Sequence, residues 1–283
     1  MLKLVQTLIA LGLCLFPGLA SAQLAPPNET GVAMGHLHYH VSDVEANTRF
    51  WVALGGKANH VGRTVVITFP DVLVLLTQEE SSGGTEGSIL NHVAFRVQSL
   101  DAVEEAGFEF DRSESFSGVT SVFTPEGERI ELFDDSATNL TFVVDDGGAD
   151  PVAERHNQPL TVPVIAHHLH LYLPDGAVDQ AKQWYTSLFG GTPGMRWRYD
   201  AVDLPGINFN FSSQPEVGAP TRGRMLDHIG FEVTNLEAFC QTLEAQGVRL
   251  EQPYRQGEFG VATAVLTDPW GTSIALTEGL RGF

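Results

Sequence analysis

The sequence has few cysteines and few basic residues. Of its two cysteines, Cys14 lies in a segment that we expect to be removed, so Cys240 would be the only thiol left and no intramolecular disulfide could form. Sixteen Lys and Arg residues against 35 Asp and Glu residues give a net charge of −19. This balance argues against a nucleic-acid partner, because a phosphate backbone requires clustered cations. The hydrophobic content of 43% is that of a globular protein.

Long apolar runs are also scarce, except at the N-terminus. Lys3, an apolar stretch over residues 4–15 and small residues at 20–22 predict a secretory signal peptide over residues 1–22, cleaved before Gln23. The stretch is too short to span a membrane. We therefore expect a secreted or periplasmic protein without a membrane anchor, a monomer or homodimer whose partner is a small-molecule substrate.

Histidine, in contrast, occurs in a regular pattern. Four times it opens a short segment in which apolar residues recur at every second position, which predicts four β-strands. Their starts lie 56, 76 and 60 residues apart, so the chain is a four-fold internal repeat. A quasi-symmetric fold would bring such imidazoles together, and paired imidazoles bind metal ions. The four segments are 36–41, 92–97, 168–173 and 228–233.

Each histidine strand opens a module with the predicted order strand, helix, strand, strand. Asp43 predicts the start of the first helix, and paired glycines predict the ends of the first and third. The aromatic pairs Phe50-Trp51 and Trp184-Tyr185 recur on these helices as expected core residues. The remaining strands are predicted at 64–69 and 72–77, 119–124 and 129–133, 196–202 and 207–211, and 262–267 and 273–277.

In these motifs the chain resembles the vicinal oxygen chelate superfamily, which includes glyoxalase I, extradiol ring-cleaving dioxygenases and bleomycin resistance proteins. The resemblance implies an α+β fold of two halves, each a pair of βαββ(β) modules that form a cup of curved sheet. We expect these halves at 34–134 and 162–279, joined by a linker at 135–161 that is rich in Asp, Gly, Ala and Pro. The motifs are Gly35-His36-Leu37-His38, Asn91-His92-Val93, Asp227-His228-Ile229-Gly230-Phe231, Trp184-Tyr185 with Leu188-Phe189-Gly190-Gly191, and Asp268-Pro269-Trp270-Gly271.

The resemblance also implies a metal site, because metal ligands in this family come from the first and last strands of a module pair. The first half offers His36, Leu75, His92 and Glu131, and the second offers His168, Asn210, His228 and Ala275. We therefore expect a divalent metal at His36, His92 and Glu131, a set that favours Fe(II) and would also accept Zn or Mn.

Other polar residues fall near this expected site. His38 and His40 share a strand face with His36 and are candidate catalytic proton carriers. Arg96 shares the face of His92 and is a candidate anchor for an anionic substrate, although His40 and Arg96 could instead be solvated at the rim. In the second half, the histidines at 167, 168 and 170 are expected to form a hydrogen-bonded cluster or to support a pocket.

The expected function is that of an exported metal-dependent enzyme acting on a small oxygen-rich compound, aromatic or with a diol or dicarbonyl group. Dioxygenase-like chemistry is favoured, because glyoxalase I usually has four protein ligands. However, ring-cleaving members usually keep their metal in the second half. The alternatives are a glyoxalase-like lyase or isomerase, and a non-catalytic protein that sequesters a small molecule by stacking on Trp197, Tyr199 or Phe209.

Overall fold

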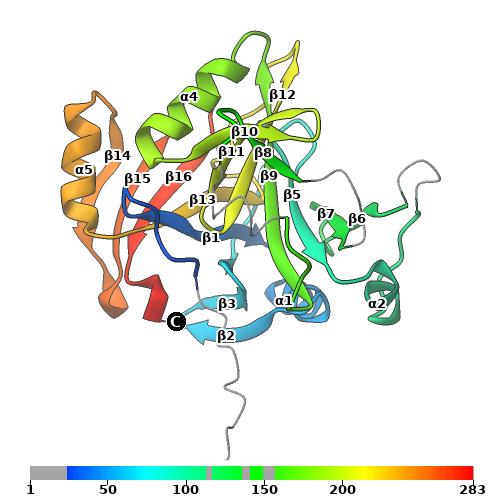
Figure 1. Cartoon of the computed structure of the whole chain (residues 1–283). Helices are drawn as coiled ribbons and strands as arrows, with labels where there is room; N and C mark the ends of the chain where they lie inside the picture. Colours follow the sequence, from blue (N-terminus) through cyan, green and yellow to red (C-terminus); the bar gives the residue numbers. More distant parts are fainter. Residues whose placement is uncertain (1–23, 113–116, 136–140, 149–156, 283) are drawn as a thin grey trace, which may run out of the picture.

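Two eight-stranded β-sheets make up the fold (Figure 1). The computed structural model describes residues 24–112, 117–135, 141–148 and 157–282, so the predicted signal peptide lies outside the described residues. Helices pack against both sheets, which confirms the expected α+β class.

The first sheet joins the first and fourth modules. Strand β1 of the first module pairs antiparallel with β13 of the fourth, and His38 lies opposite His228. The strand order is β14 (Leu250–Gln256), β15 (Ala262–Thr267), β16 (Ser273–Glu278), β13 (Leu226–Val233), β1 (Val32–Val41), β4 (Val72–Gln78), β3 (Thr64–Phe69) and β2 (Lys57–Val61).

The second sheet joins the second and third modules in the same way. Strand β5 pairs antiparallel with β9, and His92 lies opposite His170. The strand order is β6 (Val119–Phe123), β7 (Arg129–Asp134), β5 (Leu90–Val97), β9 (Val164–Pro174), β12 (Ile207–Gln214), β11 (Tyr199–Leu204), β10 (Thr192–Arg196) and β8 (Phe142–Val144).

This pairing corrects the expectation that consecutive modules share a sheet. Residues 34–134 contribute one module to each sheet, and so do residues 162–279. All four modules present an equivalent histidine strand as their pairing edge, so the repeat is equally compatible with either arrangement. The expected linker also contains an ordered part, because β8 extends the edge of the second sheet beside β10.

Side chains alternate along each strand between the hydrophobic core and the opposite face of the sheet. On β1, Leu37 and Tyr39 are buried in the main hydrophobic core, whereas the intervening histidines lie on the opposite face. One helix of each module packs on its own strands: α1 (Val44–Ala53), α2 (Leu100–Glu105), α4 (Val178–Phe189) and α5 (Leu236–Ala245).

Aromatic side chains connect the two sheets through these helices. Trp51 of α1 contacts both Phe69 of the first sheet and Phe95 of the second, with ring centroids 6.0 and 5.7 Å apart. The expected core role of these aromatics is therefore confirmed. The predicted cap is also present, since the Asp43 side chain accepts a hydrogen bond from the Ala46 amide.

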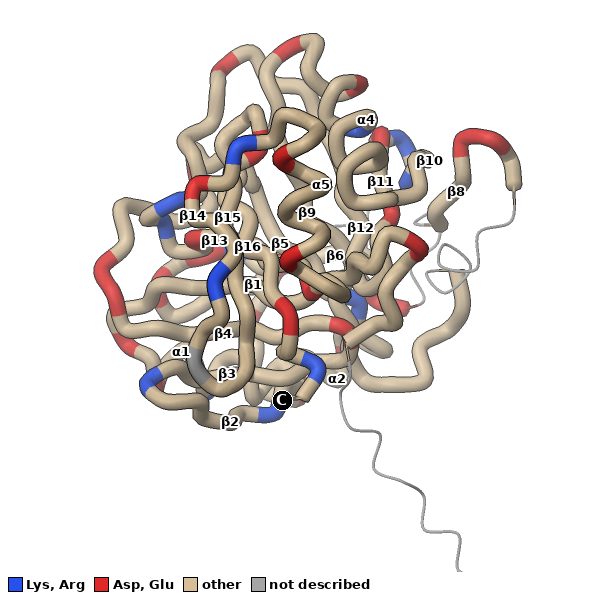
Figure 2. The backbone as a smooth tube through the Cα atoms, turned by 90° about the vertical axis from the view of Figure 1, so that its left-hand side faces the viewer, with Lys and Arg blue, Asp and Glu red and all other residues tan. Residues whose placement is uncertain are grey.

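Acidic residues outnumber basic residues by 35 to 16. Figure 2 shows Asp and Glu distributed over the loops and helices, with Lys and Arg scattered among them. Cys240 is buried on α5, and burial raises its pKa to about 11. In the described part of the chain, no helix is both long and apolar enough to cross a bilayer.

Candidate metal centre

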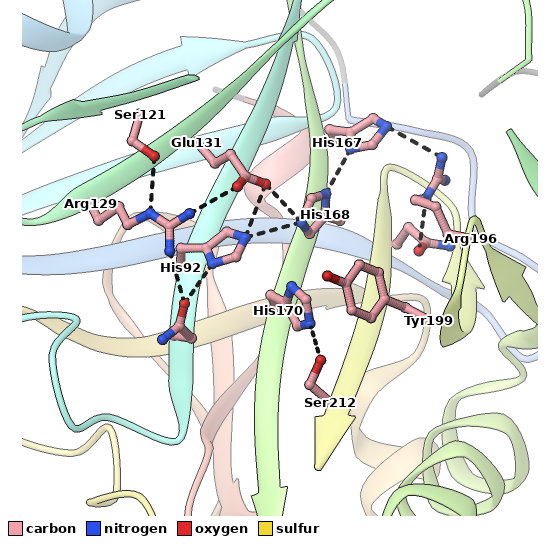
Figure 3. Close-up of polar contacts among 12 residues, drawn as sticks. His92, Ser121, Arg129, Glu131, His167, His168, His170, Arg196, Tyr199 and Ser212 are labelled. Carbon is pink, nitrogen blue, oxygen red and sulfur yellow. Dashed lines mark hydrogen bonds and ion pairs between the residues drawn. The ribbon is translucent and has the colours of Figure 1, made fainter. Parts of the chain in front are cut away.

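Three polar side chains converge on the second sheet, each from a different strand. His92 lies on β5, Glu131 on β7 and His168 on β9 (Figure 3). Ala94 of β5 lies opposite Glu131 on one side and opposite His168 on the other. His92 is two residues before Ala94 and therefore shares its face of the sheet. Strand register thus brings the three functional groups together.

The donor atoms of these residues lie close to one another. Glu131 Oε2 is 3.1 Å from His92 Nε2 and 3.6 Å from His168 Nε2, and the two ring nitrogens are 3.3 Å apart. A metal ion with ligands at roughly 2.0–2.2 Å separates neighbouring donor atoms by about 2.8–3.6 Å. The two imidazoles and the carboxylate therefore have the chemistry and the spacing required for a divalent metal ion.

This arrangement corrects part of the predicted site. His92 and Glu131 lie together as expected, but His36 lies on β1 in the first sheet. Its place is taken by His168, which occupies the equivalent position of the repeat: His36 lies opposite Gly230 as His168 lies opposite Ala94.

The predicted catalytic and substrate-binding residues also lie elsewhere. His38 and His40 are on β1 with His36, and neither lines the cavity beside Glu131. Arg96 forms an ion pair with Asp135 and donates to the main-chain carbonyl of Gln158, and it does not line that cavity. These residues were expected near the metal site because that site was expected to form between consecutive modules.

Neighbouring side chains hold the His92 ring and the carboxylate in position. Asn91 Oδ1 lies 2.8 Å from His92 Nδ1, which leaves Nε2 directed at Glu131. Arg129 donates to Asn91 Oδ1, to Ser121 Oγ and to Glu131 Oε1, the last over 2.9 Å. Such contacts fix a ligand's orientation and tautomer.

His168 is held by a buried chain of nitrogens. Its Nδ1 lies 2.7 Å from His167 Nδ1, and His167 Nε2 lies 3.3 Å from Arg196 Nη1 (Figure 3). A guanidinium can only donate, so His167 donates from Nδ1 and the His168 proton lies on Nε2. Binding of a metal ion at this atom would therefore require the proton to leave Nε2. Burial, with the nearby charges of His167 and His92, lowers the pKa of His168 far below 6.5, which keeps its ring neutral.

A cavity of about 780 Å³ opens beside these three residues. Phe123 and Trp197 line it and are 60% and 42% exposed, so they lie at its mouth. Asn210 also lines it, and Asn210 Oδ1 is buried without a hydrogen-bond partner among the described residues. The other lining residues are mainly aromatic or charged: Glu109, Phe110, Asp111, Arg129, Phe133, Tyr172, Arg196, Arg198 and Tyr199.

His170 is a further polar group in the cavity. Its Nε2 lies 2.8 Å from Ser212 Oγ, and its ring centroid lies 4.7 Å from that of Tyr199. Burial is the main cause that lowers the pKa of His170 to about 3, so the ring is neutral near pH 7. The expected histidine cluster at 167, 168 and 170 is thus present, but two of its members face the metal centre itself.

Comparison with known proteins identifies similar folds. Residues 165–276 match the family model described as the Glyoxalase/Bleomycin resistance protein/Dioxygenase superfamily. Glyoxalase I from Zea mays has a similar structure, with a TM-score of 0.60 and 15% identity over 89% of this chain and 94% of that one. A candidate dioxygenase from Bacillus subtilis gives a TM-score of 0.59 and 12% identity over 91% of this chain and 86% of that one. No curated protein sequence matches the chain.

Proposed function

We propose that the chain belongs to the glyoxalase/bleomycin resistance/dioxygenase superfamily, the family expected from its motifs, and that it is a metal-dependent enzyme acting on a small oxygen-rich aromatic compound. The observation that carries the proposal is the convergence of His92, Glu131 and His168 beside an aromatic-lined cavity.

The ligand set favours Fe(II), with Zn or Mn as alternatives. Two histidines and one carboxylate form the facial triad of non-haem Fe(II) oxygenases, which leaves coordination positions open. An ion bound there would polarise two adjacent oxygens of a substrate and stabilise their negative charge. The three converging residues already form this triad, so the proposal favours dioxygenase-like chemistry over a lyase or isomerase. His170, which has a ring nitrogen within 4.8 Å of those of His92 and His168, is the residue that could add a fourth ligand.

The chain's own residues would bind and orient the substrate. Phe123 and Trp197 at the mouth offer flat apolar surfaces to an aromatic ring. The neutral ring of His170 can accept a hydrogen bond from a substrate hydroxyl at one nitrogen, while Ser212 Oγ bonds the other. Asn210 Oδ1 supplies a buried acceptor for a second hydroxyl. His170 is the repeat equivalent of His38, the residue that the sequence suggested for a catalytic role.

One observation favours a second function. The aromatic lining would also retain a planar ligand without turnover, as in a sequestering protein. In either case the proposed site of action is outside the cytoplasm, because residues 1–22 have the pattern of a signal peptide.

The decisive experiment combines metal analysis with turnover. Untagged protein is loaded with Fe(II) without oxygen, and oxygen consumption is then measured with a panel of catechols. The Glu131→Gln and His168→Asn variants should each lose one equivalent of iron and all turnover. The matched controls are Glu251→Gln and His60→Asn, which change exposed residues outside the cavity and should behave as the parent does.

Two results would decide against the enzyme. If Glu131→Gln retains the parent's full metal content, the site is wrongly placed. If the parent binds catechols tightly but consumes no oxygen and converts none of them, the protein is a binder.

A further inference from the structure

The first sheet carries a second group of imidazoles that the proposed function does not use. His36 and His38 come from β1, and His228 comes from β13 beside it. Each ring offers a nitrogen, and the three nitrogens lie within 4.8 Å of one another. The His228 ring centroid is 5.4 Å from that of His36 and 4.6 Å from that of His38.

Neighbouring groups orient two of these rings. Asp227 Oδ1 lies 2.5 Å from His228 Nδ1, which leaves His228 Nε2 available as a ligand. Thr77 Oγ1 lies 2.8 Å from His38 Nε2, which leaves His38 Nδ1 available. A carboxylate that holds the far nitrogen of a histidine is a common support for a metal ligand.

The third ring has a donor atom without a partner. His36 is only 3% exposed, and its Nδ1 has no hydrogen-bond partner among the described residues. Its ring lies directly over Gly230: a Cβ at that position would be 2.0 Å from His36 Cε1 and 2.2 Å from Nδ1. Glycine therefore makes room for a buried imidazole, one of whose two nitrogens has no hydrogen-bond partner among the described residues.

The electrostatics suit a cation. Burial is the main cause that lowers the pKa of His36 far below 6.5 and that of His38 to about 3, so both rings are neutral near pH 7. The Asp227 carboxylate is the negative group closest to the cluster, and His40 lies between it and Glu79. Neutral imidazoles are the form that binds metal.

We propose that His36, His38 and His228 bind a second divalent metal ion, of the Zn²⁺ class, that ties β1 to β13. Its ligand set differs from that of the candidate centre, because two ligands come from one strand and Ala275 occupies the position equivalent to Glu131. None of the three histidines lines the 780 Å³ cavity, so the ion is structural. It joins the first and last modules of the chain.

The test counts zinc in untagged protein that has been stripped with a chelator and titrated with Zn²⁺. The parent should bind two equivalents, Glu131→Gln one, His228→Asn one and the double variant none. The exposed-residue variant His60→Asn is the control and should bind two. Retention of both equivalents in His228→Asn would overturn the second site, whereas retention of both in Glu131→Gln would overturn only the proposed function.

A second measurement does not depend on the fold of a histidine variant. In Glu131→Gln, where only the second site is intact, bound Cu²⁺ should show coupling to imidazole nitrogens in its electron paramagnetic resonance spectrum. Zn²⁺ should also raise the thermal midpoint of this variant, because an ion that binds only the folded state stabilises it. A copper spectrum without nitrogen coupling, or an unchanged midpoint at saturating Zn²⁺, would contradict the proposal.

Discussion

Glu128 carries a carboxyl group that the fold buries almost completely, at 2% exposure. Thr85 donates hydrogen bonds to it and the charge of Arg224 is nearby, but Glu128 Oε2 has no hydrogen-bond partner among the described residues. Burial outweighs these contacts and raises the pKa of Glu128 from 4.5 to about 7. The folded protein therefore resists ionisation of this group.

The sign of the effect on stability follows from that difference. A pKa raised in the folded state favours folding while the group is protonated, so the contribution is complete below about pH 4.5 and is lost as the pH rises through about 7. At about 1.36 kcal/mol for each unit, ionised Glu128 lowers the free energy of unfolding by about 3 kcal/mol above pH 8. Glutamine at this position would be neutral at every pH.

Urea unfolding of Glu128→Gln and the parent at pH 5 and pH 8.5 measures this difference. The variant should be more stable by about 3 kcal/mol at pH 8.5 and by less than about 1 kcal/mol at pH 5. Glu251→Gln, which neutralises an exposed carboxylate, should show no comparable pH dependence. An equal gain in the free energy of unfolding at both pH values, or no gain at pH 8.5, would refute the raised pKa of Glu128.

Three further predictions concern the metal sites and the N-terminus. Asn91→Ala removes the partner of His92 Nδ1 and should weaken metal binding at the candidate centre by about 10–100-fold, measured by competition with a chelator; unchanged affinity would contradict it. Gly230→Ala places a methyl group against the His36 ring and should abolish zinc binding at the second site only, which metal counting checks. Mass spectrometry of protein from an exporting host should give a mature chain starting near Gln23, and an intact Met1 would exclude cleavage.

The alternation of apolar residues and the turn residues predicted most elements of the fold. The strand expected at 262–267 is β15, and the helix expected from Leu236 is α5. Three strands were missed: β2 and β14, which are largely exposed edge strands without apolar alternation, and β8, a three-residue strand inside the expected linker. The strand predicted at 196–202 instead contains the turn between β10 and β11, where Trp197 has a φ of +53°. A tryptophan in that conformation gives no sequence signal for a turn.

The sequence predicted a site of two histidines and one carboxylate, but it named a different residue for one of the two histidines. His92 and Glu131 follow from the repeat and the turn that sets the register of β7, and both lie in the candidate centre. The third ligand depends on which module pairs with which, and the equivalent histidines His36 and His168 cannot be distinguished by spacing alone. Only the antiparallel contacts of β5 with β9 and of β1 with β13 decide between them.

The two histidine clusters differ in whether the residue opposite the histidine has a side-chain methyl group. The strands have the same register, with His36 opposite Gly230 in the first sheet and His168 opposite Ala94 in the second. A Cβ at 230 would lie 2.0 Å from the His36 ring, so a ring opposite Ala94 cannot take the same position. His168 instead extends to Glu131, 3.6 Å from its Nε2, whereas the first sheet has Ala275 at that place. The small residue and the carboxylate therefore change together. In the sheet with Ala94 the ring faces a carboxylate, whereas in the sheet with Gly230 the ring packs against the neighbouring strand β13.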